Sequence, residues 1–328
     1  MEGRMMRQQT LAGSGFEKYR KKTRKEQFLE DMDQIIPWKE LTAAIEPYYP
    51  KPKGAGRRPV GLERMLRIHF LQHWFELSDP GAEEALYDSR AMRNFVGIDL
   101  GREPVPDETT ICKFRHLMEK RNLGDELFRI VNVYLEENGM KLSRGTIVDA
   151  TIINAPSSTK NKDKKRDPEM HQTRKGNQWY FGMKAHVGVD SKTKMIHTVV
   201  ATAANVHDSQ VLEDLLHGEE TRVWGDSAYA GQKQVIREHA PNARDFTQHK
   251  SSRYHKLSEA ERARNRNKSK VRAKVEHVFH VMKRQFGFTK VRYRGLDKNA
   301  HFLFVNCALI NLVMARKRLL RSPRVSCA

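Results

Sequence analysis

TIVDATII, at residues 146–153, is an uninterrupted run of apolar and β-branched residues that contains a single charge, Asp149. A run of this length and composition is typical of a strand in the middle of a sheet, buried on both faces. A carboxylate in such a strand loses its hydration and needs a compensating partner. The stretch therefore predicts a central strand that carries a functional acid.

The residues after this run predict a hairpin followed by alternating helix and strand. Apolar and polar residues alternate over 183–189, a turn follows at 190–194, and a second apolar run occupies 195–201. A short helix at 208–216 and a strand at 222–226 come next. Three antiparallel strands, followed by parallel strands that are reached through helical crossovers, form the strand order of a ribonuclease-H-like sheet. We therefore expect a mixed sheet flanked by helices.

The residues before this sheet predict only helices. Apolar side chains recur at helical spacing from 28 to 138, most clearly over 62–77, where His69 and His73 are expected to pack in the core. The fold class is therefore a mixture of α+β and α/β. We expect four segments: a flexible basic arm at 1–27, an all-helical domain at 28–143, the sheet domain at 144–320 and a tail at 321–328.

The charge of the chain points to a polyanionic partner. Its 328 residues include 60 Lys and Arg against 40 Asp and Glu, which gives a net charge of +20. Such a surplus destabilises the folded state by self-repulsion unless an anion offsets it. Nucleic acid is the expected partner, although ribosomal and nucleoid proteins share this surplus and charge alone indicates no reaction.

The chain carries no sequence signal for a membrane or an oxidising compartment. No stretch reaches the roughly 18 uninterrupted apolar residues of a membrane helix, and residues 1–10 lack the apolar core of a signal peptide. Cys112, Cys307 and Cys327 form no CxxC pair, so neither a disulfide framework nor a zinc site is indicated. We therefore expect a cytoplasmic protein without a membrane partner.

A second acid, Asp226, ends the strand predicted at 222–226 and lies within WGDSAY. If that strand neighbours 146–153, the two carboxylates lie on strands about 4.8 Å apart and can reach one divalent cation. Two adjacent buried carboxylates without a cation would repel each other, and their pKa values would rise. A hard metal ion with oxygen ligands is the natural compensation.

The helix predicted at 271–286, VRAKVEHVFHVMKRQF, supplies a third acid. At about 100° per residue, its apolar residues form one buried stripe, namely Val271, Val275, Val278, Met282 and Phe286. Arg272, Glu276 and Lys283 share a separate edge of the helix. Glu276 is predicted to complete a site of three carboxylates, with Arg272 and Lys283 as phosphate ligands. The alternative is an ion pair between Arg272 and Glu276 on a solvated face, which contributes little.

Two basic segments lie beside these acids in the sequence. In the first, cations occupy consecutive even positions, which suits contact with a DNA backbone or, alternatively, a solvated loop. Its predicted DNA contacts are Arg262, Arg264, Arg266, Lys268 and Lys270. The second, at 157–178, contains the predicted DNA contacts Lys164 and Lys165. Trp179 at its end is a candidate for stacking on an unpaired base, and the alternative is an anchor of the loop in the core.

The helix predicted at 108–120 has the polar and basic N-terminal half of a recognition helix in a helix-turn-helix. Its predicted DNA contacts are Thr109, Thr110, Lys113 and Arg115. An ordinary bundle helix is the alternative, with Ile111, Phe114, Leu117 and Met118 facing inward. On the first interpretation, the helical domain at 28–143 binds DNA.

Three long motifs resemble the insertion-sequence-five family of bacterial DDE transposases. They are IVDATIINAPSSTKNKDKKRDPEMHQTRKGNQWYFGMKAHVGVD at 147–190, GDSAY at 225–229 and RAKVEHVFHVMKRQFG at 272–287. The resemblance continues through 62–88 and 106–119, so it covers nearly the whole chain. A related pattern, Tyr-x2-Arg-x3-Glu-x6-Lys, maps onto Ser269, Arg272, Glu276 and Lys283, of which Ser269 departs from it and lacks the Tyr hydroxyl.

This resemblance implies a ribonuclease-H-like core in which Asp149, Asp226 and Glu276 are the catalytic acids and bind two Mg²⁺ ions, with Mn²⁺ able to substitute. It implies an enzyme that binds the terminal inverted repeats of an insertion sequence, cleaves DNA by two-metal hydrolysis and joins the 3′ ends to target DNA. Two element ends require at least two subunits, so a homo-oligomer is expected in the active complex. The implied location is the bacterial cytoplasm, in association with the nucleoid.

Two other functions would use the same features. A nuclease would need the same three acids but would not join strands, and a DNA-binding repressor would use the helical domain on an inactive core. The presence of all three acids argues against the repressor.

Overall fold

The computed structural model describes residues 21–52, 58–140, 143–252 and 256–321. Most of the predicted arm at 1–27 and of the predicted tail at 321–328 lies outside the described residues. Helix α2 (Arg24–Ile35) begins inside the predicted arm, because Thr23 caps it by accepting a hydrogen bond from the Glu26 amide at 3.1 Å. Residues 24–27 are therefore part of the helical bundle.

The N-terminal half is helical throughout its described residues, as the sequence predicts. Its helices are α2 (Arg24–Ile35), α3 (Trp38–Ile45), α4 (Leu62–Phe75), α5 (Asp79–Asp88), α6 (Arg90–Val96), α7 (Glu108–Lys120) and α8 (Leu123–Glu137). Asp107 caps α7 by accepting a hydrogen bond from the Thr110 amide at 2.7 Å. Pro80 follows the end of α4 and lies in the first turn of α5, where the missing N–H has no partner to lose.

The sheet contains six strands in the order β2-β3-β1-β5-β6, with β4 paired to β3. They are β1 (Gly145–Asn154), β2 (His171–Lys175), β3 (Gln178–Asp190), β4 (Ile196–Ala203), β5 (Arg222–Trp224) and β6 (Arg244–Asp245). β3 pairs antiparallel with β1 and β4, whereas β5 pairs parallel with β1 and with β6. The central place of β1 and the ribonuclease-H-like order are thus confirmed.

The connections around β5 differ from the predicted regular helix at 208–216. Two short 3₁₀ turns, η2 (Asp208–Val211) and η3 (Glu213–Leu215), take its place. The buried Glu220 carboxylate accepts hydrogen bonds from the amides of His217 and Gly218, both at 2.8 Å, and this draws the chain out of a helix. Helix α9 (Lys233–His239) then leads from β5 to β6.

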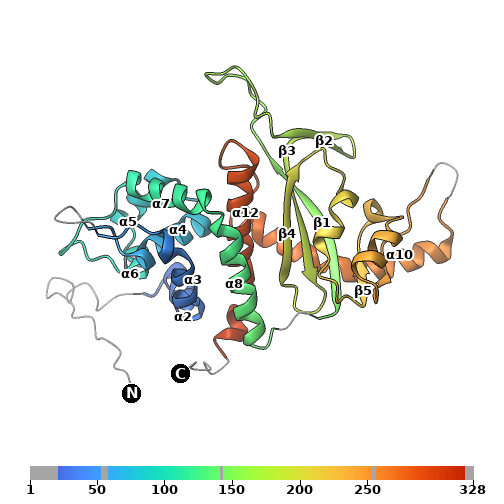
Figure 1. The fold of residues 1–328 in the computed structure, drawn as a ribbon, viewed down its shortest axis with the longest axis horizontal. Coiled ribbons are helices and arrows are strands. Elements are labelled where there is room, and N and C mark those ends of the chain that lie inside the picture. The colour runs from blue at the N-terminus through green and yellow to red at the C-terminus, as the bar shows by residue number, and fades with distance from the viewer. Residues whose placement is uncertain (1–20, 53–57, 141–142, 253–255, 322–328) are drawn as a thin grey trace.

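Helix α12 (Leu296–Leu319) joins the helical bundle to the sheet. It packs against α8, α2, α4 and α7 on one side and against β4 on the other, and Figure 1 shows it beside α8 between the bundle and the sheet. By length and composition α12 could cross a membrane, but 72% of its most apolar window is buried within the protein, as in a core helix. The boundary predicted near residue 143 therefore separates helices from strands without separating two cores.

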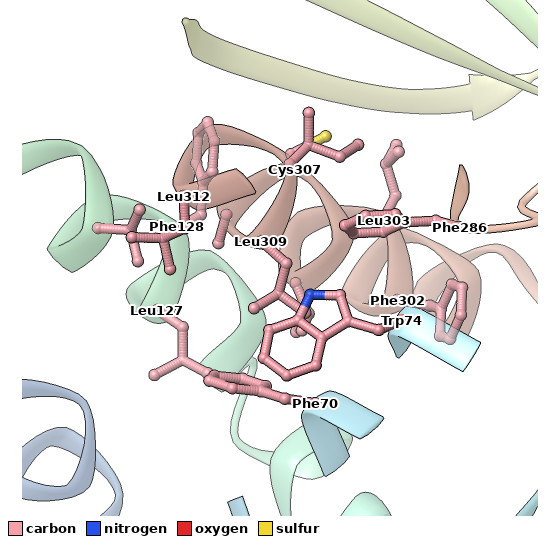
Figure 2. Close-up of a cluster of buried hydrophobic side chains, with 14 of the residues drawn as sticks. Phe70, Trp74, Leu127, Phe128, Phe286, Phe302, Leu303, Cys307, Leu309 and Leu312 are labelled. Atoms are coloured by element: carbon pink, nitrogen blue, oxygen red, sulfur yellow. The ribbon is translucent and has the colours of Figure 1, made fainter. Parts of the chain in front are cut away.

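The main hydrophobic core is continuous across that boundary. Figure 2 shows its centre, which includes Phe70, Trp74, Leu127, Phe128, Phe302, Leu303 and Leu309. His69 and His73 are 2% and 1% exposed, which confirms that they pack in the core. His73 stacks on Phe302 with ring centroids 4.2 Å apart, and its Nδ1 lies 3.0 Å from Asn306 Oδ1. Burial lowers the pKa of His73 well below its usual value, so this contact between α4 and α12 is uncharged at neutral pH.

One buried amide fixes α12 to the free edge of the sheet. Asn311 is fully buried, its Oδ1 accepts from the Ile196 amide at 2.9 Å, and its Nδ2 donates to the Ile196 carbonyl at 2.7 Å. Nδ2 also donates to Asn132 Oδ1 of α8 at 2.8 Å. Because β4 pairs only with β3, Asn311 satisfies backbone groups on its open edge that would otherwise be buried without partners.

We predict that Asn311→Ala lowers the free energy of unfolding by about 2–4 kcal/mol, because it leaves the amide and the carbonyl of Ile196 buried and unpaired. Asn132→Ala is the matched control, since it removes one side-chain hydrogen bond and should cost about 1 kcal/mol. Urea unfolding followed by circular dichroism measures both. Equal losses in the two variants would show that Asn311 does not support β4.

Candidate active site

Asp149 and Asp226 are brought together by the parallel pairing of β1 with β5. Ile147 lies opposite Trp224 in this register, and each acid follows its strand residue by two positions. β5 ends at Trp224, so Asp226 lies just beyond the strand and caps the 3₁₀ helix η4 (Ser227–Tyr229) by accepting from the Ala228 amide at 2.8 Å. The two acids therefore line one cleft, as expected for neighbouring strands, but Asp226 lies beyond β5 and not within a strand at 222–226 as predicted.

Asp149 is a buried carboxylate whose charge is only partly compensated. It is 8% exposed, and it accepts hydrogen bonds from Arg272 Nη1 at 2.5 Å and from the Ala150 amide at 2.8 Å. Burial raises the pKa of Asp149 to about 6, and the opposing effect of Arg272 is too small to cancel it. An additional cation at this position would stabilise the ionised form.

The helix that carries Glu276 is not continuous, contrary to the prediction for 271–286. α10 (Glu259–Arg272) ends at the cap residue Ala273, α11 (Lys274–His280) follows, and a π-helical turn, η5, occupies Val281–Gln285. The π turn widens the helix so that Val281 and Met282 are both buried, and the Phe286 amide donates to the Val281 carbonyl at 3.0 Å. The predicted stripe is otherwise confirmed, since Val275, Val278, Met282 and Phe286 are buried and Val271 is half-buried.

Arg272 lies between two of the three predicted acids. Its Nη1 is 2.5 Å from Asp149 Oδ2 and 3.9 Å from Glu276 Oε1. The Glu276 side chain is 63% exposed, so this longer contact is the solvated pair that the sequence left as an alternative. Within the part of the chain that the structure describes, no three His, Cys, Asp or Glu side chains are assembled closely enough to hold a metal ion as they stand.

A single open cleft of about 750 Å³ nevertheless collects all five residues of the predicted centre. Asp149, Asp226, Glu276, Arg272 and Lys283 line it together. Lys283 Nζ donates to the Ile152 carbonyl at 2.8 Å, and burial, followed by the charge of Lys175, lowers its pKa. The cleft also has polar lining residues that were not predicted for the site: Arg174, Lys175, Lys184, Asp208, His280 and Arg284.

The unpredicted cations come from elements whose positions depend on the fold. Arg174 and Lys175 end β2, and the β2–β3 hairpin carries them to the cleft. In the sequence, the one feature that could have indicated Arg174 and Lys175 is that they lie in the basic segment at 157–178. Lys184 lies in β3, and its alternation with apolar neighbours indicates a strand without indicating which edge of the sheet it reaches.

Most of the basic segment before Glu276 is helix α10, so the alternative of a solvated loop is wrong. Ser258 begins α10 with a capping box that includes Glu261. In a helix, even positions alternate between two sides, so Arg262, Arg266 and Lys270 form an exposed stripe. Lys268 is on the other side, donates to the Thr247 carbonyl at 2.6 Å, and has a pKa that burial lowers. Arg264 is exposed on that same side.

Trp179 is 64% exposed, so the alternative that it anchors its loop in the core is wrong. It pairs with Arg174 across the hairpin, and the Arg174 guanidinium lies 6.0 Å from the centre of the indole ring. Lys164 and Lys165 are exposed in the segment before β2. That segment is attached to the start of α12, because Asp167 accepts from the Gly295 amide at 2.7 Å.

Helix α7 has the inward face of a bundle helix, with Ile111, Phe114 and Met118 buried. The prediction of Arg115 as a DNA contact is corrected, since its guanidinium is buried and pairs with Asp79 at 2.7 Å and Glu119 at 2.8 Å. The guanidinium N–H groups that would have to bind a phosphate therefore already donate to Asp79 and Glu119.

The other predicted contacts of α7 lie near its exposed N-terminal end. Thr109 and Lys113 are exposed, and Thr110 is half-buried. Thr109 Oγ1 donates to the capping residue Asp107 at 2.7 Å, so its hydroxyl is engaged within the protein. Lys113 is thus the cation of this group that remains available on the surface of α7.

Comparisons with known proteins match both halves of the chain. A family model described as "Transposase DDE domain" matches residues 141–312, and one described as "Transposase domain (DUF772)" matches residues 17–117. Among solved structures, the cryo-EM structure of a piggyBac transposase synaptic complex with hairpin DNA resembles the chain with a TM-score of 0.42 at 10% identity. That likeness covers 88% of this chain and 73% of the other. Neither family model is specific to the insertion-sequence-five family.

We predict that Asp149→Asn stabilises the protein increasingly as the pH rises. The folded pKa of Asp149, about 6, exceeds the value near 3.9 expected in the unfolded chain, so the folded state binds the extra proton between these values. The free energy of unfolding contributed by Asp149 therefore falls as the pH rises from about 4 to 6, by up to about 3 kcal/mol. The free energy of unfolding of Asp149→Asn minus that of the wild type should therefore increase by up to about 3 kcal/mol over the same pH range.

Urea unfolding of both proteins between pH 4 and pH 8, without divalent metal, measures the difference and cancels the titration of the buried histidines. Asp190→Asn is a control whose difference from the wild type should stay constant over this range. Burial raises the pKa of Asp190, but hydrogen bonds from Ser143 and Thr193 outweigh it and lower that pKa below its usual value, so Asp190 titrates below pH 4. A difference between wild type and Asp149→Asn that does not change with pH would contradict the prediction.

Proposed function

Because the chain belongs to the transposase DDE domain family, whose model matches residues 141–312, we propose that it is a Mg²⁺-dependent DNA transposase of the insertion-sequence-five type. It binds the terminal inverted repeats of its element, cleaves DNA there and joins the 3′ ends to target DNA. The main support is the cleft at the centre of the ribonuclease-H-like sheet, where Asp149, Asp226 and Glu276 occur together with Arg272 and Lys283.

Asp149, Asp226 and Glu276 are the proposed ligands of two Mg²⁺ ions, for which Mn²⁺ can substitute. Their carboxylate oxygens are the donors that hard divalent cations prefer, and the incompletely compensated burial of Asp149 favours a cation beside it. When bound, such ions activate the attacking water and stabilise the leaving 3′ oxygen. The three acids would hold these ions, and no covalent intermediate with the enzyme would be needed.

Arg272 has two successive roles in this proposal. Without metal, its guanidinium neutralises Asp149 through the contact at 2.5 Å. Cations on the carboxylates would replace that charge, and the planar guanidinium would then be free to bind a DNA phosphate. Its Nε is buried and has no hydrogen-bond partner among the described residues, so one donor is already unused.

The remaining cations of the cleft are proposed to hold the DNA backbone. Lys283 faces Lys175 of the hairpin across the cleft, and the mutual repulsion of these cations is relieved when a phosphate lies between them. Further proposed contacts outside the cleft are Arg262, Arg264, Arg266, Lys270, Lys164, Lys165, Thr109, Thr110 and Lys113, with Trp179 stacking on an unpaired base.

The proposed reaction also sets requirements beyond one chain. Cleavage releases a 3′ hydroxyl, which becomes the nucleophile that attacks a phosphate of the target DNA. Two element ends must be joined to one target, so at least a dimer forms the active complex. The protein is proposed to work in the bacterial cytoplasm with the nucleoid as its substrate.

The direct test incubates the purified chain with labelled DNA from both ends of its own element, Mg²⁺ and a supercoiled target plasmid. Labelled ends joined to the plasmid are expected. Cleavage without joined product would identify a nuclease, and binding without cleavage would identify a repressor.

We predict that Asp149→Asn, Asp226→Asn and Glu276→Gln each lower the cleavage rate by at least about a hundredfold while end binding stays within about threefold of wild type, because each loses metal affinity and leaves the basic surface unchanged. Asp214→Asn is the matched control, since Asp214 is exposed and does not line the cleft. Gel shifts and cleavage assays measure the two effects. A variant that cleaves at the wild-type rate would exclude its residue from the triad.

We predict that Lys175→Ala and Lys283→Ala weaken DNA binding and reduce the slope of log affinity against log salt by about one unit each, because each removes a phosphate contact. The exposed Lys192, at the opposite end of β3, provides the control Lys192→Ala. Titrations by fluorescence anisotropy at several salt concentrations give the slopes. An unchanged slope, or full recovery of cleavage in excess Mg²⁺, would show that these lysines do not bind phosphate.

A further inference from the structure

A fourth carboxylate, that of Asp208, lines the same cleft and has no role in the predicted triad. It is the first residue of η2, which follows β4. Asp149 pairs with Val187 on one face of the sheet, whereas the neighbouring pairs, Ala150 with His186 and Ile152 with Lys184, belong to the other face. Because Lys184 contacts Asp208, this acid approaches the centre from the face opposite Asp149.

Asp208 is held in place through one of its oxygens only. Lys184 Nζ donates to Asp208 Oδ1 at 2.8 Å and to the Val206 carbonyl at 2.6 Å. His186 Nδ1 lies 4.0 Å from the same oxygen. Oδ2 accepts no hydrogen bond from any residue that the structure describes, and the side chain is 22% exposed. One oxygen therefore fixes the carboxylate, and the other is available to a ligand in the cleft.

Two buried polar groups beside Asp208 lack hydrogen-bond partners among the described residues. They are the Tyr229 hydroxyl and His186 Nδ1, and both side chains are fully buried. Burial raises the pKa of Tyr229, and the charges of Asp208, Asp149 and Asp226 raise it further, so the hydroxyl lies near all three carboxylates. Native proteins rarely leave such groups unpaired except where a ligand or an ion completes the site.

We propose that Asp208 is a fourth carboxylate of the metal centre and that it holds one of the divalent cations together with Asp149 and Asp226. This inference rests on the proposed function, because it assumes that the cleft binds metal. Three carboxylates that approach from two faces of the sheet surround a cation more completely than two on one face, and hard cations favour several oxygen ligands. Tyr229 would then donate its hydroxyl to one of these carboxylates.

A purely structural role for Asp208 is the competing explanation. In that case the contact with Lys184 only fixes the turn between β4 and η2. Asp208→Asn separates the two roles, because the amide oxygen still accepts from Lys184 Nζ but the negative charge that a cation needs is lost. Asp208→Ser is a second variant, since its hydroxyl is too short to reach a cation in the cleft.

The experiment measures Mn²⁺ binding to the full chain without DNA, by electron paramagnetic resonance of the free ion. The proteins are wild type, Asp208→Asn, Asp208→Ser, Asp149→Asn and the control Asp214→Asn. We expect Asp208→Asn and Asp208→Ser to weaken the binding of at least one Mn²⁺ ion by at least about tenfold, as Asp149→Asn does, and Asp214→Asn to match the wild type. Melting temperatures without metal identify any variant that is unfolded.

The outcomes distinguish this inference from the proposed function. If Asp149→Asn loses Mn²⁺ affinity and folded Asp208 variants do not, Asp208 is a structural residue and the inference is overturned while the triad stands. If neither Asp149→Asn nor the Asp208 variants lose affinity, the cleft does not bind metal and the proposed function fails with it. If Asp208→Asn does not fold, the result for Asp208→Ser decides.

Discussion

The burial of α12 is the constraint on which the rest of the structure depends. This helix contacts the bundle through α8, α2, α4 and α7 and the sheet through β4, so its apolar side chains join both into one core. Its buried Asn311 also binds the backbone of β4 at the open edge of the sheet. Because the middle of α12 is buried, the helix cannot shift without exposing part of this shared core. The position of the sheet, and of the acids on it, is therefore fixed relative to the helical bundle.

Electrostatics at the centre oppose stability in the absence of a ligand. Asp149 is buried where the solvent cannot hydrate its charge, and Arg272 compensates it only in part. Further acids and further cations line the cleft around these two residues, and side chains of like charge repel one another. Such an arrangement is unfavourable in the free protein and becomes favourable when cations and phosphates enter together. The buried charge of Asp149 therefore lowers the stability of the free protein at the position where the proposed function needs a carboxylate.

The acids and the cations of the cleft come from different parts of the fold, with one exception. Asp149, Asp226 and Asp208 lie on the sheet or in its immediate connections, whereas Glu276 lies on α11 among the cations. Cations come from the β2–β3 hairpin and from the helices that follow β6, whose longer side chains reach over the acids. Short carboxylate ligands and longer cationic side chains would suit the proposed centre, which has to hold metal ions and follow a DNA backbone. The exposed stripe on α10 extends the basic surface beyond the cleft.

Local sequence determined most of the elements and indicated the candidate acids, although the regular helix expected at 208–216 and the continuous helix expected at 271–286 are not present. The run at 146–153 is too apolar for any place but the middle of a sheet, so Asp149 was identifiable before the fold was known. The apolar stripe around Glu276 likewise indicated a helix that buries one side. These patterns follow from periodicity, which a single segment carries by itself.

Tertiary structure decided which charged side chains are paired inside the protein and which line the cleft. Arg115 and Arg272 are both arginines on helices, yet one is buried against Asp79 and the other lines the cleft, because different neighbours pack against them. The π turn after α11 and the approach of Asp208 from the second face depend on contacts between segments far apart in the sequence. No single segment contains those contacts, since burial and hydrogen bonding are set by the neighbours that the whole fold supplies.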